Sequence, residues 1–343
     1  MKLSVGHKIV ILIGVCIVST SAFAQDKPIW RVAWANDEIV GSDNQFTNGA
    51  FLQKSSILAD SLEQAGGTPA FGKGLASLVL PKRAGLFYRE TWTVGQNLQT
   101  PDRISERDII LTDVPYVSML GWTNSHIAFN DQELTGFQTL LGWVGDLTLG
   151  EETQSLAHDI TGATDPKGWD NQLDNEPLLN LYVMRKAKFY NNDWMDAAWN
   201  LDAALGNFFT LGQAALEFRF GNRPAGFAPV GTPIGRSMDY NARILDPGVG
   251  YFYTSAIVRG TGLLFALPRD GNLLRDGNDW TDDEQLDTKN LLGQLILGLH
   301  YETLNWGAHL NVFLATDSAE ANNGSNLEDP SNNFAILSVE WTF

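Results

Sequence analysis

A two-residue period of hydrophobicity, repeated along much of the chain, constrains the fold more than any other feature of the sequence. The segments 196–205, 216–220 and 294–302 each alternate charged or amide residues with bulky apolar ones. Successive side chains of a strand point to opposite faces of a sheet, so this pattern predicts strands with one apolar face and one polar face. Such strands suit a wall between lipid and a polar interior.

The C-terminal segment 333–343 shows the same alternation and ends on an aromatic residue. One of its faces is wholly apolar and ends at Phe343, while the other passes from Phe334 and Ile336 to polar residues such as Glu340. A terminal strand of this kind resembles the last strand of bacterial outer-membrane barrels. The alternative is a soluble β-sandwich, whose edge strands also alternate. We favour the membrane barrel because the N-terminus agrees with it.

The segment 1–24 has the three parts of a secretory signal peptide. A basic start is followed by the apolar run 9–18 and by the small-x-small cleavage site 22–24. The apolar run is shorter than the roughly 20 residues that a membrane-spanning helix needs. A lipoprotein anchor at Cys16 is disfavoured, because Val15 is too large to precede a lipidated cysteine. We therefore expect a signal peptide at 1–24 and one mature domain at 25–343.

Cleavage would remove the only cysteine, so the mature chain is expected to form no disulfide. It would also remove two of the 23 basic residues, leaving 21 against 40 acidic residues and a net charge near −19. A net negative charge of this size excludes a nucleic-acid-binding protein that contacts the phosphate backbone, because such a protein needs a basic surface.

Twelve segments have strand character, an even number, as a closed single-chain barrel prefers. They are 29–36, 46–56, 84–96, 113–129, 132–146, 178–189, 193–206, 208–220, 250–267, 289–303, 306–316 and 333–343. With both termini at the periplasm, the long polar connections after the odd-numbered strands face outward. The connections 57–83 and 221–249 are too long for ordinary periplasmic turns. The prolines and glycines of the connection 221–249 predict that it is an ordered segment, which we call the excursion.

The outward connection 150–177 contains the one histidine that lies in a helical pattern. Glu151, Gln154 and His158 share one face of this helix, and a more apolar face lies opposite. Gly162 is a natural C-terminal stop. A polar stripe that ends in a histidine, in an otherwise strand-rich chain, suggests a functional site.

Two short motifs flank the first outward connection. Asn36-Asp37 ends the first strand and Thr47-Asn48-Gly49 begins the second, so both reach the same rim as His158. Taken alone, these motifs are more simply read as the opening and closing of a turn.

Together with the histidine segment, these motifs resemble the lipid A 3'-O-deacylases of the outer membrane, the LpxR family. The resemblance covers nearly the whole mature chain and has four sharp points. They are A-N-D at 35–37, F-T-N-G at 46–49, G-Q-N-L-Q-T-P at 95–101, and G-E-E-T-Q-x-x-A-H followed by G-W-D-N-Q-L-x-N-E-P through 177. The order of these motifs is specific, although each is weak alone.

The resemblance implies an all-β transmembrane antiparallel barrel of 12 strands, with a short helix in an outward loop. It also implies calcium-dependent removal of the 3'-linked acyloxyacyl chain of lipid A, with chemistry like that of secreted phospholipases A2. The protein is then expected in the bacterial outer membrane as a monomer, acting on lipopolysaccharide. The site residues that it implies are His158 as general base, Asn36 and Gln154 as further catalytic residues, and Asp37, Thr47 and Gly49 at calcium.

This chemistry is physically reasonable for the residues named. A neutral imidazole near pH 7 can accept a proton from water, and a hard cation held by oxygen ligands can neutralise a developing oxyanion. The sequence contains no G-x-S-x-G nucleophile elbow, which weakens a serine-hydrolase reading.

Three departures from the family pattern concern the substrate contacts. Thr164 stands where some relatives carry Glu six residues after the histidine, with Asp165 adjacent. A basic pair expected to touch lipid phosphates is represented loosely by Arg103 and Arg107. The pattern D-R-P-Y-A-G-W of relatives has become 113–119, D-V-P-Y-V-S-M.

Two other functions remain open at this point. A phospholipase-type barrel would act on glycerophospholipids and would generally use a serine nucleophile paired with histidine. A passive porin would need an open lumen, whereas bulky inward residues such as Phe334 and Ile336 predict a largely filled one.

Overall fold

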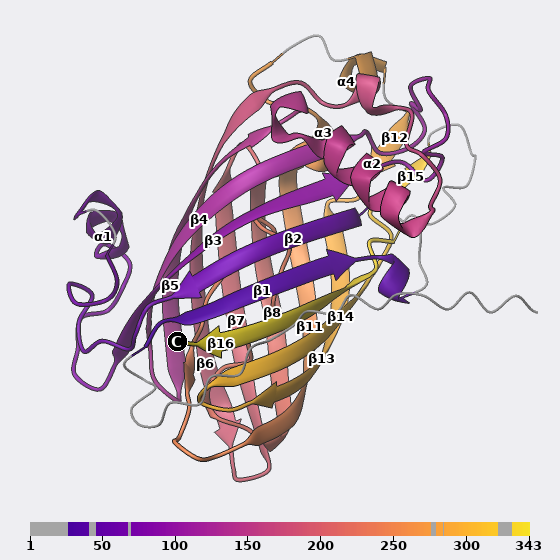
Figure 1. Ribbon diagram of the computed structural model, residues 1–343. Helices are drawn as coiled ribbons and strands as arrows, with labels where there is room; N and C mark the ends of the chain where they lie inside the picture. The colour runs from indigo at the N-terminus through magenta and orange to yellow at the C-terminus, as the bar shows by residue number, and fades with distance from the viewer. Residues whose placement is uncertain (1–26, 41–45, 68–69, 276–278, 284, 322–330) are drawn as a thin grey trace, which may run out of the picture.

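The computed structural model describes residues 27–40, 46–67, 70–275, 279–283, 285–321 and 331–343. Its strands close into a barrel in the order β1-β16-β14-β13-β11-β8-β7-β6-β5-β4-β3-β2, and every neighbouring pair is antiparallel (Figure 1). The predicted twelve-stranded barrel is confirmed. The predicted signal peptide at 1–24 lies outside the described residues.

The twelve wall strands lie within a few residues of the predicted segments. They are β1 (Ile29–Asn36), β2 (Phe46–Ser55), β3 (Phe87–Gln99), β4 (Val117–Phe129), β5 (Glu133–Val144), β6 (Glu176–Asn191), β7 (Met195–Gly206), β8 (Phe209–Asn222), β11 (Tyr251–Ala266), β13 (Leu291–Glu302), β14 (Trp306–Ala315) and β16 (Phe334–Thr342).

The connections carry short elements, of which only the helix α2 was predicted. The helices are α1 (Ala70–Ala76), α2 (Gly150–Thr161), α3 (Leu267–Asp270), α4 (Asp279–Asp283), and the 3-10 turns η2 (Glu38–Val40), η3 (Asp146–Thr148) and η4 (Trp169–Asn171). Two small sheets pair β9 (Ala225–Gly226) with β10 (Arg243–Ile244), and β12 (Leu286–Thr288) with β15 (Ala319–Ala321).

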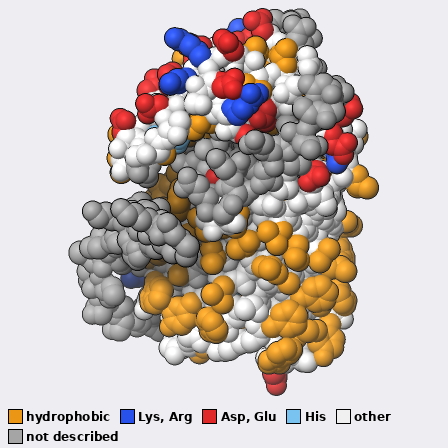
Figure 2. Space-filling model, turned by 90° about the vertical axis from the view of Figure 1, so that its right-hand side faces the viewer, with side chains coloured by type: hydrophobic (Ala, Val, Ile, Leu, Met, Phe, Trp, Pro, Cys, Tyr) orange, Lys and Arg blue, Asp and Glu red, His pale blue; other side chains and the backbone are white. Residues whose placement is uncertain are grey.

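The alternation in the sequence separates the two faces of the wall. Along β13, Leu295, Leu297 and Leu299 are exposed, whereas Ile296 and His300 are buried toward the lumen. Figure 2 shows hydrophobic side chains gathered over the lower part of the barrel and charged side chains around the loop end. This division fits a wall that faces lipid, with the charged loop end in water.

None of the helices in the described ranges is long and apolar enough to cross a membrane.

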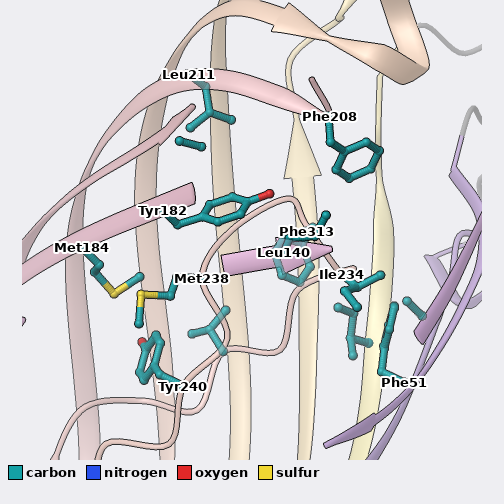
Figure 3. Close-up of a cluster of buried hydrophobic side chains, with 14 of the residues drawn as sticks. Phe51, Leu140, Tyr182, Met184, Phe208, Leu211, Ile234, Met238, Tyr240 and Phe313 are labelled. Carbon is teal, nitrogen blue, oxygen red and sulfur yellow. The ribbon is translucent and has the colours of Figure 1, made fainter. Parts of the chain in front are cut away.

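The connection 221–249, for which the sequence suggested only an ordered excursion, folds into the barrel. Ile234 O accepts a hydrogen bond from Asn97 Nδ2 at 2.8 Å, and Gly235 O accepts one from Tyr182 Oη at 2.6 Å. Figure 3 shows Ile234, Met238 and Tyr240 of this excursion among side chains of the wall. The excursion therefore fills the middle of the lumen with a packed core.

The excursion is also held by buried ion pairs. Arg243 of β10 bonds to Glu302 of β13 and, at 2.7 Å, to Glu340 of β16, which also accepts a bond from Arg31 of β1 at 2.9 Å. All four side chains are at most 5 % exposed. Arg243 of the excursion thus links two wall strands across the lumen, and Glu340 extends the network to β1 through Arg31.

The second long connection, 57–83, lies outside the barrel. Figure 1 shows α1 beside the wall, and Leu62 and Leu80 of this connection pack with Tyr88 and Phe137 of β3 and β5. This connection therefore covers part of the outer face of the wall and leaves the lumen unaffected.

A filled lumen predicts that the protein does not conduct ions. In planar bilayers we expect no stepwise conductance from the full chain, whereas replacing 227–241 with a two-residue Gly-Ser link should open a pore, because the packed core is then lost. Shortening 57–83 is the matched control and should leave conductance absent, since that connection lies outside the barrel. Regular conductance steps from the unaltered protein would contradict a filled lumen and support the porin reading.

Candidate active site

The ends of β1 and β2 bring two of the predicted motifs into contact. The register pairs Asn36 with Asn48 and Ala35 with Gly49. Asn36 Nδ2 donates to the backbone oxygen of Thr47 at 2.8 Å. Thr47 lies at an irregularity in the pairing with β3, and its Oγ1 is 2.8 Å from Thr100 Oγ1. Residues of three separate motifs therefore meet at one point of the rim.

This point of the rim carries oxygen atoms suited to a hard cation. Asn36 Oδ1 is buried and has no hydrogen-bond partner in the described part of the chain. The neighbouring Asp37 carboxylate is buried at 2 % exposure. Amide and carboxylate oxygens are the ligands that calcium prefers, so these residues fit such an ion.

Among the described residues, no group of three or more His, Cys, Asp or Glu side chains could hold a metal ion. A cation at the rim would accordingly depend on amide, hydroxyl and backbone oxygens besides Asp37. Gly49 lies inside the ladder, paired with Ala35 on one side and Asn97 on the other.

The helix α2 is fixed at its start by contacts to the wall. Thr148 O accepts a bond from Gln96 Nε2 of β3 at 2.7 Å. A Cβ at Gly150 would lie 2.3 Å from Ser118 Cβ and 2.9 Å from the Trp169 ring, so glycine is required for this close approach. The helix ends as predicted at Gly162, whose φ is +75° and whose N–H bonds to His158 O at 2.7 Å.

His158 lies in the last turn of α2 and is held by the chain that follows it. Its Nδ1 is 2.5 Å from the backbone oxygen of Thr164. A carbonyl oxygen only accepts, so Nδ1 is the donor in this contact, and in the corresponding tautomer Nε2 is the nitrogen with the free lone pair. Residue 164, the position at which some relatives carry Glu, thus contacts His158 through its backbone oxygen in this chain.

Gln154 points from α2 toward a buried aromatic pair. Its Oε1 accepts a bond from Trp169 Nε1 at 2.8 Å, and it is only 2 % exposed. Trp169 packs on Tyr116, with 5.0 Å between the ring centroids. Burial raises the pKa of Tyr116 to about 12, so this phenol remains a neutral donor to Ile104 O at 3.2 Å. Gln154 therefore couples α2 to the loop beneath it.

The exposed side of α2 carries two large apolar residues beside the acidic Glu151, Glu152 and Asp159. Leu156 is 62 % exposed and Ile160 is 77 % exposed, while Gln154 is buried and His158 is half-buried. A surface helix normally buries its large apolar residues, so the exposure of Leu156 and Ile160 is a departure from the usual arrangement. Large apolar side chains exposed at the end of a membrane barrel are suited to a contact with lipid.

Figure 1 shows α2 lying across the end of the barrel at which β1 ends and β2 begins. The predicted site residues therefore share one rim.

Arg103 and Arg107, the two basic residues considered for contact with lipid phosphates, are both engaged in exposed ion pairs. Arg103 pairs with Glu106 at 2.9 Å, and Arg107 pairs with Asp170 at 3.1 Å. Sequence reasoning did not single out Thr100 or Tyr116 as part of the site, although Thr100 lies within the 95–101 motif.

The comparisons with known proteins agree with this architecture. The sequence model of the family described as "Outer membrane protein LpxR" matches residues 10–343. LpxR from Salmonella typhimurium superposes with a TM-score of 0.69 at 15% identity, covering 92% of this chain and 100% of that chain. The beta domain of the Bordetella autotransporter BrkA gives a TM-score of 0.41 at 10% identity, covering 92% of this chain and 99% of that chain. No curated protein matches the chain.

Proposed function

The chain belongs to the LpxR family of outer membrane proteins, and on that basis we propose that it is a lipid A deacylase that hydrolyses the 3'-linked acyloxyacyl ester. One observation carries the proposal beyond family membership. In α2, at the loop end of the barrel, Leu156 and Ile160 are exposed and His158 is half-buried. This arrangement suits an ester whose acyl chains lie against the outside of the barrel in the outer leaflet.

His158 is the general base in this proposal. The contact from Nδ1 to Thr164 O fixes the ring and the tautomer, so the lone pair of Nε2 can accept a proton from water. The hydroxide so formed would attack the ester carbonyl, and the protonated imidazole would return the proton to the leaving alkoxide. No acyl-enzyme is needed. Gln154 acts as a positioning residue, because its bond to Trp169 holds α2 in place.

Asn36, Asp37, Thr47 and Gly49 are proposed to hold calcium at the rim. The buried Asn36 Oδ1 beside the buried Asp37 carboxylate supports this assignment. A calcium ion bound there would neutralise the charge that develops on the ester carbonyl oxygen. The bond from Asn36 Nδ2 to Thr47 O keeps the two strand ends together and thereby fixes the direction of Asn36 Oδ1.

The test of this function uses a host that makes hexa-acylated lipid A. Expression of the full chain should remove one acyloxyacyl unit, which mass spectrometry of the extracted lipid A detects. The phospholipase alternative predicts loss of acyl chains from glycerophospholipids and inhibition by a serine-directed reagent. The proposed mechanism predicts neither outcome.

Asp37→Asn should raise the calcium concentration needed for half-maximal deacylation by at least about tenfold, since it removes the one carboxylate proposed at the ion. The measurement is a calcium titration of the purified protein in detergent, after removal of metal by a chelator. Asp170→Asn, in the exposed pair with Arg107, is the matched control and should leave the titration unchanged. An identical calcium requirement for Asp37→Asn and the unaltered protein would exclude Asp37 as a ligand.

A further inference from the structure

A cavity of about 150 Å³ lies inside the barrel, away from the rim site. Its floor is formed by Thr232, Pro233 and Arg236 of the excursion, and its sides reach Arg269 and Ser318 beyond the outward ends of β11 and β14. A cavity of this size holds a benzene-sized molecule. The space is thus large enough for a small ligand and lies on the outward side of the plugged lumen.

The charge in this cavity is positive, although the chain as a whole has a net charge of −17. Arg236, Arg259 and Arg269 line it, and no Asp or Glu is among the described residues of its lining. Arg269 is paired with Asp270 at 2.7 Å, and Arg236 donates to Asn332 Oδ1 at 2.9 Å. Arg259 differs from the other two in having a buried guanidinium nitrogen without a hydrogen-bond partner among the described residues.

Arg259 is 8 % exposed, and its Nε has no hydrogen-bond partner within the described ranges. Its Nη1 donates a long hydrogen bond to Gln294 Oε1, at 3.4 Å. The charge of Asp202 on β7 acts on Arg259, but no carboxylate of a described residue lies within 4.0 Å to form an ion pair. A buried guanidinium with an unused donor is costly unless a partner arrives, and an oxyanion is the partner that suits it.

Two other polar atoms of the cavity lining are buried and lack a hydrogen-bond partner among the described residues. Gln213 Oε1 and Thr232 Oγ1 are buried without partners among the described residues, although Gln213 Nε2 donates to Thr261 Oγ1 at 3.2 Å. The remaining walls are apolar and include Phe209, Phe313 and Phe334. The lining therefore combines one anion-binding end with an aromatic and aliphatic surface.

From these features we infer that the outward lumen is a second ligand site, which takes a small apolar carboxylate with its carboxylate on Arg259. This inference does not depend on the hydrolysis proposed above, because none of the rim residues lines the cavity. An inorganic anion would pair with Arg259 but would make no apolar contact with the aromatic walls. A neutral apolar molecule would contact these walls but would leave Arg259 without an anionic partner.

Benzoate is the probe of choice, and calorimetric titration of the refolded full-length barrel in detergent is the measurement. We expect saturable benzoate binding, and binding at least about tenfold weaker for benzyl alcohol and for inorganic phosphate. Arg259→Gln should weaken benzoate binding by at least about tenfold, Arg259→Lys by less, and Arg185→Gln, on the outer wall, not at all. Ala315→Phe, which fills the cavity, should also abolish binding.

Each variant is first checked for the heat-dependent electrophoretic shift of a folded barrel. Equal affinity of Arg259→Gln and the unaltered protein for benzoate would overturn the inference. So would equal affinity for benzyl alcohol, which would indicate a merely apolar cavity, or for phosphate, which would indicate an anion site without an apolar part.

Discussion

His158→Ala is expected to lower the rate of lipid A deacylation by about 10²- to 10⁴-fold, the contribution typical of a general base. The structural reason is the contact of Nδ1 with Thr164 O at 2.5 Å, which leaves Nε2 as the proton acceptor at the rim. The rate is measured by mass spectrometry of Kdo-lipid A incubated with purified, folded protein. A rate for His158→Ala within threefold of the unaltered protein would exclude this base.

Two control variants separate the chemistry of His158 from structural effects. His126→Asn removes a histidine of β4 that is 1 % exposed and is acted on by the charge of Lys73 in the 57–83 connection, and it should keep full activity once folding is confirmed. Thr164→Ala should also remain active, because the contact to His158 comes from the backbone of residue 164. A strong loss of activity in Thr164→Ala would show that its side chain takes part.

Arg243→Met is expected to destabilise the folded barrel by about 3–5 kcal/mol, the cost of leaving a buried charge without its partner. Arg243 bonds to Glu302 and Glu340 in the lumen, and Arg31 remains as the one other arginine bonded to Glu340 among the described residues. The free energy of unfolding is measured by urea titration in lipid vesicles. Arg107→Met, which breaks the exposed pair with Asp170, should change it by less than about 1 kcal/mol. Equal effects of the two variants would contradict the assigned role of the lumen network.

The strands could be predicted from the sequence because their pattern is local. Each wall strand repeats one apolar and one polar face, so the alternation by itself marks Leu295, Leu297 and Leu299 as a lipid-facing row. The excursion 221–249 could not be placed in the same way. Its position inside the lumen depends on partners distant in the sequence, such as Glu340 for Arg243 and Asn97 for the backbone of Ile234.

The location of the candidate site at one rim could be predicted from the sequence, but the orientation of α2 could not. The topology of an even-stranded barrel brings Asn36, Asp37 and His158 to one rim from distant points of the sequence. The sequence pattern also divided α2 into a polar face and an apolar face, but it did not show that Gln154 is buried while Leu156 and Ile160 are exposed. That orientation follows from tertiary contacts, chiefly the bond of Gln154 to buried Trp169 and the close packing at Gly150.

The most direct measurement of the central claim is the mass of lipid A from cells that express the full chain, with calcium present. Hydrolysis at the 3' position predicts a new lipid A species that lacks one acyloxyacyl unit, and the species should disappear when calcium is chelated from the isolated membranes. An unchanged lipid A mass, with the folded barrel present in the outer membrane, would contradict the proposed function.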